Sequence, residues 1–140
     1  MIFVAPEVAL LRGFGVPTGP LEEAVDSISR AAPFRQLRTP GGRPMSAQQT
    51  NCGDCGWYSD SAGYRYETFD PLTGHPWPPM PEAFRHLAVD AARRAGYAHY
   101  DPDTCLLNRY VDGARMGAHR DADERDFTQT ESMDYIRAVL

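Results

Sequence analysis

The sequence lacks a long hydrophobic run and contains few cysteines, and both absences narrow the class of protein. No stretch approaches the roughly 20 consecutive apolar residues that a transmembrane helix needs. The apolar N-terminal stretch has no basic residue ahead of it and is interrupted by Pro6 and Glu7, so it does not resemble a signal peptide. The three cysteines are an odd number and provide no disulfide framework. We therefore expect a cytoplasmic protein that does not enter a membrane.

Cys52 and Cys55 form a CxxC pair, a spacing that occurs in zinc sites and in redox-active turns. A closed zinc site needs four ligands, and no second pair follows. The pair also does not open a helix in a βαβ setting, as a redox motif does. The sequence therefore favours neither zinc nor redox chemistry here.

Acidic residues are missing from one long segment, although the chain as a whole is acidic. The net charge of −5 argues against binding nucleic acid through overall electrostatics. Between Ser27 and Gly53, however, there is no acidic residue. Four positive charges occur in this segment, at Arg30, Arg35, Arg38 and Arg43. This basic segment is suited to contact phosphates, and the alternative is an arginine-rich surface of no special purpose.

The length and the hydrophobic pattern predict one α+β domain. A chain of 140 residues is long enough for a core of its own. Period-two and period-3.6 patterns, bounded by proline and glycine, predict short strands and two helices. We expect strands over residues 8–14, 48–51, 55–59, 64–69 and 104–110, a helix of about 12 residues from Pro20, and a second helix that starts at Pro81.

The stretch 104–123 carries the polar residues that matter most. With strand periodicity, Leu106, Asn108 and Tyr110 share one face. After the Asp112-Gly113 turn, a second short strand would bring His119 and Asp121 to one side. An imidazole and a carboxylate two residues apart can reach one ion. They supply two of the three ligands in the two-histidine, one-carboxylate triad that binds non-haem Fe(II). An isolated His-x-Asp is more often a pair of solvated residues, so the neighbouring motifs decide its meaning.

These neighbours form a set that resembles a known family. Asn108 and Tyr110 precede the His-x-Asp and Asp123 follows it, while TNCGDCGW at 50–57 and TPGGRPMS at 39–46 lie upstream. In this order the motifs resemble the AlkB family of alkylated-DNA repair dioxygenases, from about Pro33 to Gln129.

The resemblance implies a fold and a division of the chain. The expected core is an incomplete double-stranded β-helix, or jelly roll, with N-terminal helices packed on the sheet. Residues 1–35 would form an N-terminal strand and helix, and 36–80 a nucleotide-recognition lid. Residues 81–129 would form the second helix and the first jelly-roll strands, with a divergent tail over 130–140.

The resemblance also implies a reaction and its site. N-alkylated bases such as 1-methyladenine and 3-methylcytosine would be oxidatively demethylated with Fe(II), O₂ and 2-oxoglutarate, releasing formaldehyde, succinate and CO₂. The partner would be single- or double-stranded DNA, with RNA left open, and the protein a monomer. By carry-over, the iron ligands are His119 and Asp121, the 2-oxoglutarate residues are Leu106, Asn108 and Tyr110, the substrate residues are Trp57, Tyr64 and Asp123, and the lid residues are Thr39, Pro40 and Gly41.

The substrate residues also make physical sense for a cationic base. An aromatic face at Trp57 and a carboxylate at Asp123 favour a positively charged ring over a neutral one. The alternative is that the aromatic residues of this hairpin only pack against each other.

The chain departs from the family pattern after the His-x-Asp. No histidine follows His119, and the later arginines are Arg120, Arg125 and Arg137. The family takes its third iron ligand and its 2-oxoglutarate clamp from a later histidine and arginines. We therefore interpret the chain as a C-terminally truncated member. The alternatives are a non-catalytic nucleic-acid-binding remnant and a small β-rich domain without a ligand.

This interpretation predicts little or no demethylase activity for the 140-residue chain alone, because one imidazole and one carboxylate bind iron weakly. The measurement is formaldehyde release from a methylated oligonucleotide in the presence of Fe(II) and 2-oxoglutarate. Turnover equal to that of a full-length relative would contradict this expectation.

Overall fold

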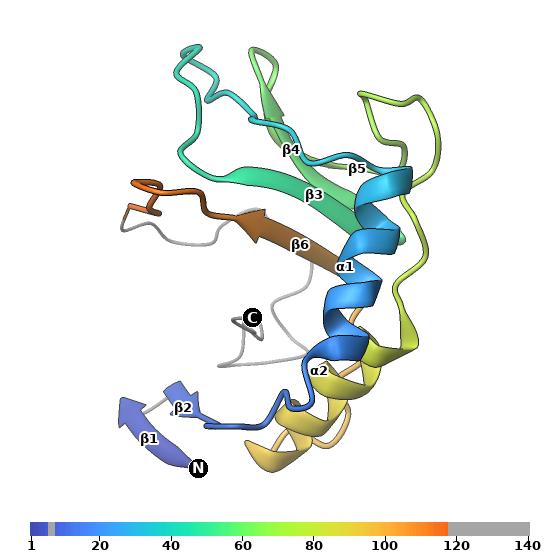
Figure 1. Cartoon of the computed structure of the whole chain (residues 1–140). Helices are drawn as coiled ribbons and strands as arrows, with labels where there is room; N and C mark the ends of the chain where they lie inside the picture. The colour runs from blue at the N-terminus through green and yellow to red at the C-terminus, as the bar shows by residue number, and fades with distance from the viewer. Residues whose placement is uncertain (6–7, 118–140) are drawn as a thin grey trace. The chain divides into compact units, whose positions relative to one another are not determined.

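The computed structural model describes residues 1–5 and 8–117, which carry two helices and six short strands (Figure 1). These residues divide into two units. The first unit contains Met1–Ala24 and Pro81–Pro102, and the second contains Val25–Met80 and, within the described part, residues 103–117. No helix in the described part is long and apolar enough to cross a membrane.

In the first unit, strands β1 (Ile2–Ala5) and β2 (Val8–Leu10) pair antiparallel. The strand expected over residues 8–14 is therefore wrong beyond Leu10. Residues 12–15 form a turn instead, in which Gly13 adopts a φ of +64°. A backbone with positive φ cannot continue an extended strand, so the pairing ends before this glycine.

Helix α2 (Glu82–Arg94) also belongs to the first unit and confirms the second predicted helix. Pro81 occupies the position just before the helix, where a missing N–H is harmless. At the other end Gly96 has a φ of +101°, and the N–H of Tyr97 donates to the carbonyl of Ala92 at 2.9 Å. A glycine with positive φ at this position ends the helix.

Helix α1 (Gly19–Ala31) confirms the first predicted helix. Its apolar stripe is buried at Leu21 and Ile28, which are 6% and 2% exposed. The helix begins in the first unit and ends in the second. Apolar residues at helical spacing therefore predicted both the helix and its buried face.

The second unit is built on two antiparallel pairs of strands. Strand β3 (Gln48–Gly53) pairs with β6 (Thr104–Arg109), and β4 (Gly56–Asp60) forms a hairpin with β5 (Gly63–Glu67). These strands confirm the predicted ones to within a few residues. Within the described part, the buried apolar residues of this unit are Ile28, Ala32, Leu37, Ala47, Cys52, Trp77 and Leu107.

Three polar side chains of β3 join it to the chain around it. Thr50 donates its hydroxyl to the carbonyl of Ala32 at 2.7 Å. Asn51 binds both backbone groups of Trp57, accepting from the N–H and donating to the carbonyl, each at 3.0 Å. Gln49 donates to Asn108 on β6 at 2.9 Å. Buried polar groups must be hydrogen-bonded, so β3 fixes the places of the segments that surround it.

A buried ion pair holds the loop after β5 to the segment before β3. The Arg35 guanidinium binds both carboxylate oxygens of Asp70, at 2.9 and 2.7 Å, and lies 5.3 Å from the ring centroid of Trp77. The Asp70 side chain is 0% exposed. Arg35 therefore does not belong to the exposed basic surface that either interpretation of this segment expects, because Asp70 neutralises its charge inside the protein.

Replacement of Asp70 by alanine should lower the free energy of unfolding by about 3–5 kcal/mol, because it leaves the Arg35 cation buried without a partner. Chemical denaturation of the purified chain measures this change. The matched control is Asp60→Ala, which removes an equally bidentate but solvent-accessible pair with Arg65 and should cost much less. Equal losses for the two variants would contradict the assignment.

Candidate functional site

The residues predicted to line the 2-oxoglutarate pocket lie on β6 and just after it. Leu106 and Asn108 share the face that also carries Asn51 and Gln49, their partners on β3. Leu107 lies on the opposite face and is buried. Leu106 is 37% exposed, and Tyr110, one residue beyond the end of β6, is 46% exposed. The structure confirms the predicted alternation of faces for Leu106, Leu107 and Asn108, whereas the face of Tyr110 and the pocket itself remain predictions.

The predicted iron ligands belong to the stretch after residue 117. His119, Asp121 and the substrate residue Asp123 lie outside the described residues. Within residues 1–5 and 8–117, no three His, Cys, Asp or Glu side chains come together in a way that could hold a metal ion. The convergence of residues 119 and 121 on one ion therefore stays a prediction.

The predicted substrate aromatics stack on each other. The rings of Trp57 and Tyr64 are 5.6 Å apart between centroids, with an angle of 19° between their planes. In the register of the hairpin, Tyr64 is opposite Ser59 and Trp57 is opposite Tyr66, so the two aromatic residues are diagonal neighbours on one face. Tyr64 is 48% exposed. The pair therefore forms one aromatic platform that is open to solvent on its tyrosine side.

Arg65 supports the hairpin that carries this platform. It binds both oxygens of Asp60 and also Glu67, and its guanidinium lies 5.5 Å from the ring centroid of Tyr58. These two carboxylates raise the pKa of Arg65. The Arg65 hydrogen bonds, together with the N–H of Ala62, lower the pKa of Asp60. One cation thus connects the turn of the hairpin to its open end.

The predicted lid residues form a turn, as their composition indicates. The N–H of Thr39 donates to the carbonyl of Arg43 and the N–H of Gly42 to the carbonyl of Thr39, each at 2.8 Å. Gly42 has a φ of +85°, which explains why a glycine stands there. The hydroxyl of Ser59 donates to the carbonyl of Arg38 at 2.7 Å. The turn is therefore attached directly to β4, the strand that carries Trp57.

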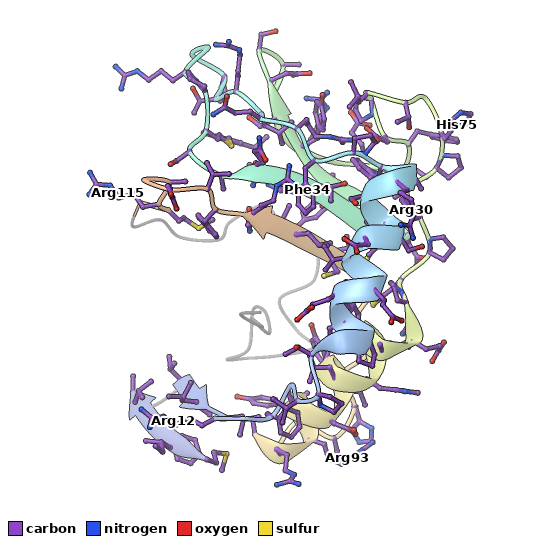
Figure 2. The ribbon with its side chains drawn as sticks, in the orientation of Figure 1. Arg12, Arg30, Phe34, His75, Arg93 and Arg115 are labelled. Carbon is purple, nitrogen blue, oxygen red and sulfur yellow. The ribbon has the colours of Figure 1, made fainter. Side chains whose placement is uncertain are left out.

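The remaining arginines of the basic segment are exposed. Arg30 projects from α1, as Figure 2 shows, and Arg43 lies at the turn. Arg38 is exposed as well, although its guanidinium donates to the carbonyl of Gly42 at 2.8 Å. Arg115 lies farther along the chain in the same unit and is also exposed. The second unit therefore keeps exposed cations even though Arg35 is neutralised internally.

Sequence reasoning missed one pair of thiols. It considered Cys52 with Cys55, whereas the register of β3 and β6 places Cys52 directly opposite Cys105. None of the three cysteines is part of a disulfide. A hydrogen bond between the two side chains, together with burial, raises the pKa of Cys52, and the same bond lowers the pKa of Cys105. Only the strand register could have shown this pairing.

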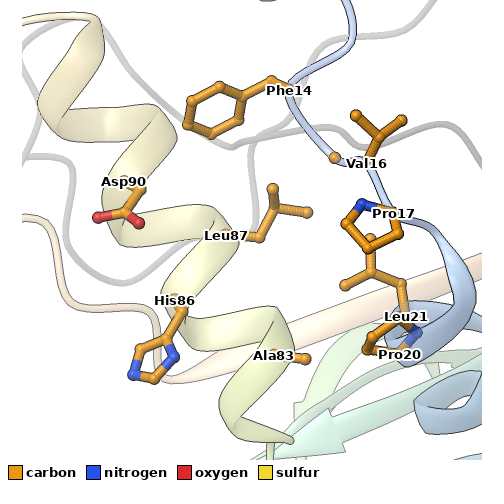
Figure 3. A pocket seen from close by; sticks show the side chains of 10 residues that line it. Phe14, Val16, Pro17, Pro20, Leu21, Ala83, His86, Leu87 and Asp90 are labelled. Carbon is orange, nitrogen blue, oxygen red and sulfur yellow. The ribbon is translucent and has the colours of Figure 1, made fainter.

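The first unit contains a hollow of about 330 Å³ that the sequence did not indicate (Figure 3). Apolar side chains from α2, from the start of α1 and from the segment before α1 line most of it, among them Phe14, Val16, Leu21 and Leu87. His86 and Asp90 of α2 also belong to its lining. Among the predicted site residues that the structure describes, none lines this hollow.

Comparison with known proteins identifies the family. The model of the 2OG-Fe(II) oxygenase superfamily matches residues 8–130, which is most of the chain. The chain therefore belongs to this superfamily, whose fold is the jelly roll. This membership implies Fe(II) and 2-oxoglutarate as cofactors.

Within the superfamily, the chain falls in the AlkB family. It is 47% identical over 102 residues to the alpha-ketoglutarate-dependent dioxygenase AlkB of Escherichia coli K12, covering 73% of this chain and 47% of that protein. It is 44% identical over 124 residues to AlkB of Salmonella typhimurium, covering 88% of this chain and 57% of that protein. An AlkB homologue from Caulobacter vibrioides NA1000 is 43% identical over 131 residues, covering 88% of this chain and 58% of the homologue. The chain thus spans about half the length of the curated relatives that it matches.

Replacement of Arg65 by glutamine should raise the pKa of Asp60 toward its ordinary value of 3.8, because the main group that lowers it is removed. NMR titration of the Asp60 carboxyl measures this shift. The same shift in pKa determines how the stability of the hairpin changes with pH. A lowered folded pKa stabilises the hairpin above the ordinary pKa, and this contribution is lost as pH falls through the lowered value. Arg85→Gln, which removes a cation in the other unit, is the control, and an unchanged Asp60 pKa in Arg65→Gln would contradict the assignment.

Proposed function

We propose that this protein repairs alkylated nucleic acid by oxidative demethylation of N-methylated bases, with 1-methyladenine and 3-methylcytosine as its substrates. The observation that supports this most is the arrangement of β6. Leu106 and Asn108 share one face of the strand, and the His-x-Asp begins ten residues after the strand ends, in a chain of the 2OG-Fe(II) oxygenase superfamily.

The residues fit the cofactors in their chemistry. His119 and Asp121 are an imidazole and a carboxylate, the donors that non-haem Fe(II) takes in a facial triad. The amide of Asn108 and the hydroxyl of Tyr110 can donate hydrogen bonds to a carboxylate of 2-oxoglutarate, and Leu106 offers an apolar wall to its methylene groups. When bound, Fe(II) and 2-oxoglutarate would supply the oxidation of the N-methyl group with O₂, and formaldehyde, succinate and CO₂ would be the products.

In this reaction the side chains of the protein would bind and orient the base. A methylated adenine or cytosine ring carries positive charge, and the Trp57 and Tyr64 platform presents an aromatic face to it. Asp123 would add a carboxylate that favours the cation over the undamaged base. A base inside a duplex has to leave the stack before it can reach such a platform.

The turn at Thr39, Pro40 and Gly41 would belong to the lid that covers this base, within residues 36–80. Its support is the hydrogen bond from Ser59 to Arg38, which connects the turn to the strand of Trp57. The exposed side chains of Arg38 and Arg43 stand beside the turn and would contact the phosphates that flank the flipped nucleotide.

A metal titration tests the proposal without relying on turnover. Manganese(II), used in place of Fe(II), should bind to the chain, and His119→Ala or Asp121→Ala should weaken that binding about 10-fold or more, because each removes a direct ligand. Calorimetry measures the affinity. His75→Ala is the matched control, since it removes an exposed histidine from a loop of the second unit.

Equal affinity in all three variants would show the metal site to be wrong. If the chain also bound single-stranded DNA with no dependence on metal, the result would favour the non-catalytic nucleic-acid-binding alternative.

A further inference from the structure

Gln49 is placed to orient Asn108, one of the residues proposed to bind 2-oxoglutarate. The two residues are direct partners in the register of β3 and β6. The side-chain nitrogen Nε2 of Gln49 donates to Oδ1 of Asn108 at 2.9 Å. Gln49 is 4% exposed, so water does not compete for this hydrogen bond.

The backbone of Gln49 forms two hydrogen bonds with Arg35, on the side of β3 away from β6. Its N–H donates to the carbonyl of Arg35 at 2.8 Å, and its carbonyl accepts from the N–H of Arg35 at 3.0 Å. Arg35 is in turn held by its two bonds to the buried Asp70. Gln49 therefore stands between two fixed segments and has little freedom to follow a movement of Asn108.

The hydrogen bond decides which end of the Asn108 amide is available to a ligand. An amide carries an acceptor on one side and donors on the other. Because Oδ1 accepts from Gln49, Nδ2 is directed to the opposite side of the amide. Within residues 1–5 and 8–117, the Asn108 side chain makes no other hydrogen bond.

We propose that Gln49 is a positioning residue that holds the Asn108 amide with its Nδ2 donor toward a carboxylate of 2-oxoglutarate. This inference rests on the proposed function, in which Asn108 contacts that cosubstrate. A carboxylate only accepts hydrogen bonds, so the reversed amide would set two acceptors against each other and lose a charge-assisted bond. The correct orientation is present before the cosubstrate arrives.

The amide oxygen of Gln49 allows a substitution that should not unfold the protein. This oxygen, Oε1, is buried and has no hydrogen-bond partner within the described residues. A methionine of similar size at this position would remove that unsatisfied atom together with the bond to Asn108. The two effects on stability oppose each other, so Gln49→Met is expected to fold. A weaker affinity for 2-oxoglutarate would then report the orientation of Asn108 and not unfolding.

Two variants of Gln49 and two matched controls test this role in the 140-residue chain. Gln49→Glu replaces the donor by a second acceptor, which turns the Asn108 amide around. Gln49→Met removes the donor and leaves the amide free to rotate. The controls are Gln48→Glu and Gln48→Met. Gln48 directly precedes Gln49 in β3, faces the opposite side of the strand, and accepts a hydrogen bond from Nε of Arg109 at 2.8 Å.

Two measurements are made on each variant. Calorimetry with the manganese-loaded chain gives the affinity for 2-oxoglutarate. We expect Gln49→Glu to weaken it about 10- to 100-fold, the worth of one hydrogen bond to a charged group, and Gln49→Met to weaken it by a smaller factor. NMR of the Asn108 side-chain amide in the metal-free chain should show altered nitrogen and proton shifts in both. The Gln48 variants should leave both the affinity and the shifts unchanged.

The outcomes separate this inference from the proposed function. If the unmodified chain binds 2-oxoglutarate and both Gln49 variants bind it equally well, Gln49 has no positioning role and the proposed function stands. If the unmodified chain does not bind 2-oxoglutarate, the proposed function fails and this inference fails with it. If Gln49→Glu does not fold, Gln49→Met decides the question.

Discussion

The second unit depends on the hydrogen bonds of three consecutive polar side chains in β3. Gln49, Thr50 and Asn51 are all at most 4% exposed, in a strand where apolar residues are the usual choice. An unpaired polar group at such a position would destabilise the fold, so each of the three requires a partner on a different segment. They find these partners at β6, at the end of α1 and at β4. The strand thereby places the proposed cosubstrate residue Asn108 and the proposed substrate residue Trp57 around one element.

The space around this strand is filled closely on the side of Trp77. A Cβ atom added to Gly56 would lie 2.4 Å from the Trp77 ring and 2.8 Å from Cβ of Asn51, so only glycine fits there. Trp77 also donates its ring N–H to the carbonyl of Glu67 at 2.8 Å. The same ring packs under the Arg35 guanidinium. The hairpin that presents Trp57 and Tyr64 is thus held at its base by packing and at its turn by Arg65, so the aromatic platform sits on a rigid support.

The similarity to AlkB proteins and the arrangement of the site residues both support the proposed repair function. The match to the 2OG-Fe(II) oxygenase superfamily covers residues 8–130. The structure adds arrangements that the motifs do not contain, such as the stacking of Trp57 on Tyr64 and the connection of the lid turn to β4. The structure also takes Arg35 out of the exposed basic surface, because this residue belongs to the internal ion pair with Asp70.

Both helices and most of the strands could be predicted from the amino-acid sequence, because hydrophobic period, proline and glycine act over a few residues. The family could be predicted as well, because its motifs are short and stand in a fixed order along the chain. It also showed that Leu106 and Asn108 share a face, since alternation along a strand is local. The partners of residues that are distant in the chain became known from the folded structure: Asp70 for Arg35, Cys105 for Cys52, and Asn108 for Gln49. These pairings depend on strand register and on where a loop returns in space. No local pattern encodes them, because the residues of each pair are 35 or more positions apart in the chain.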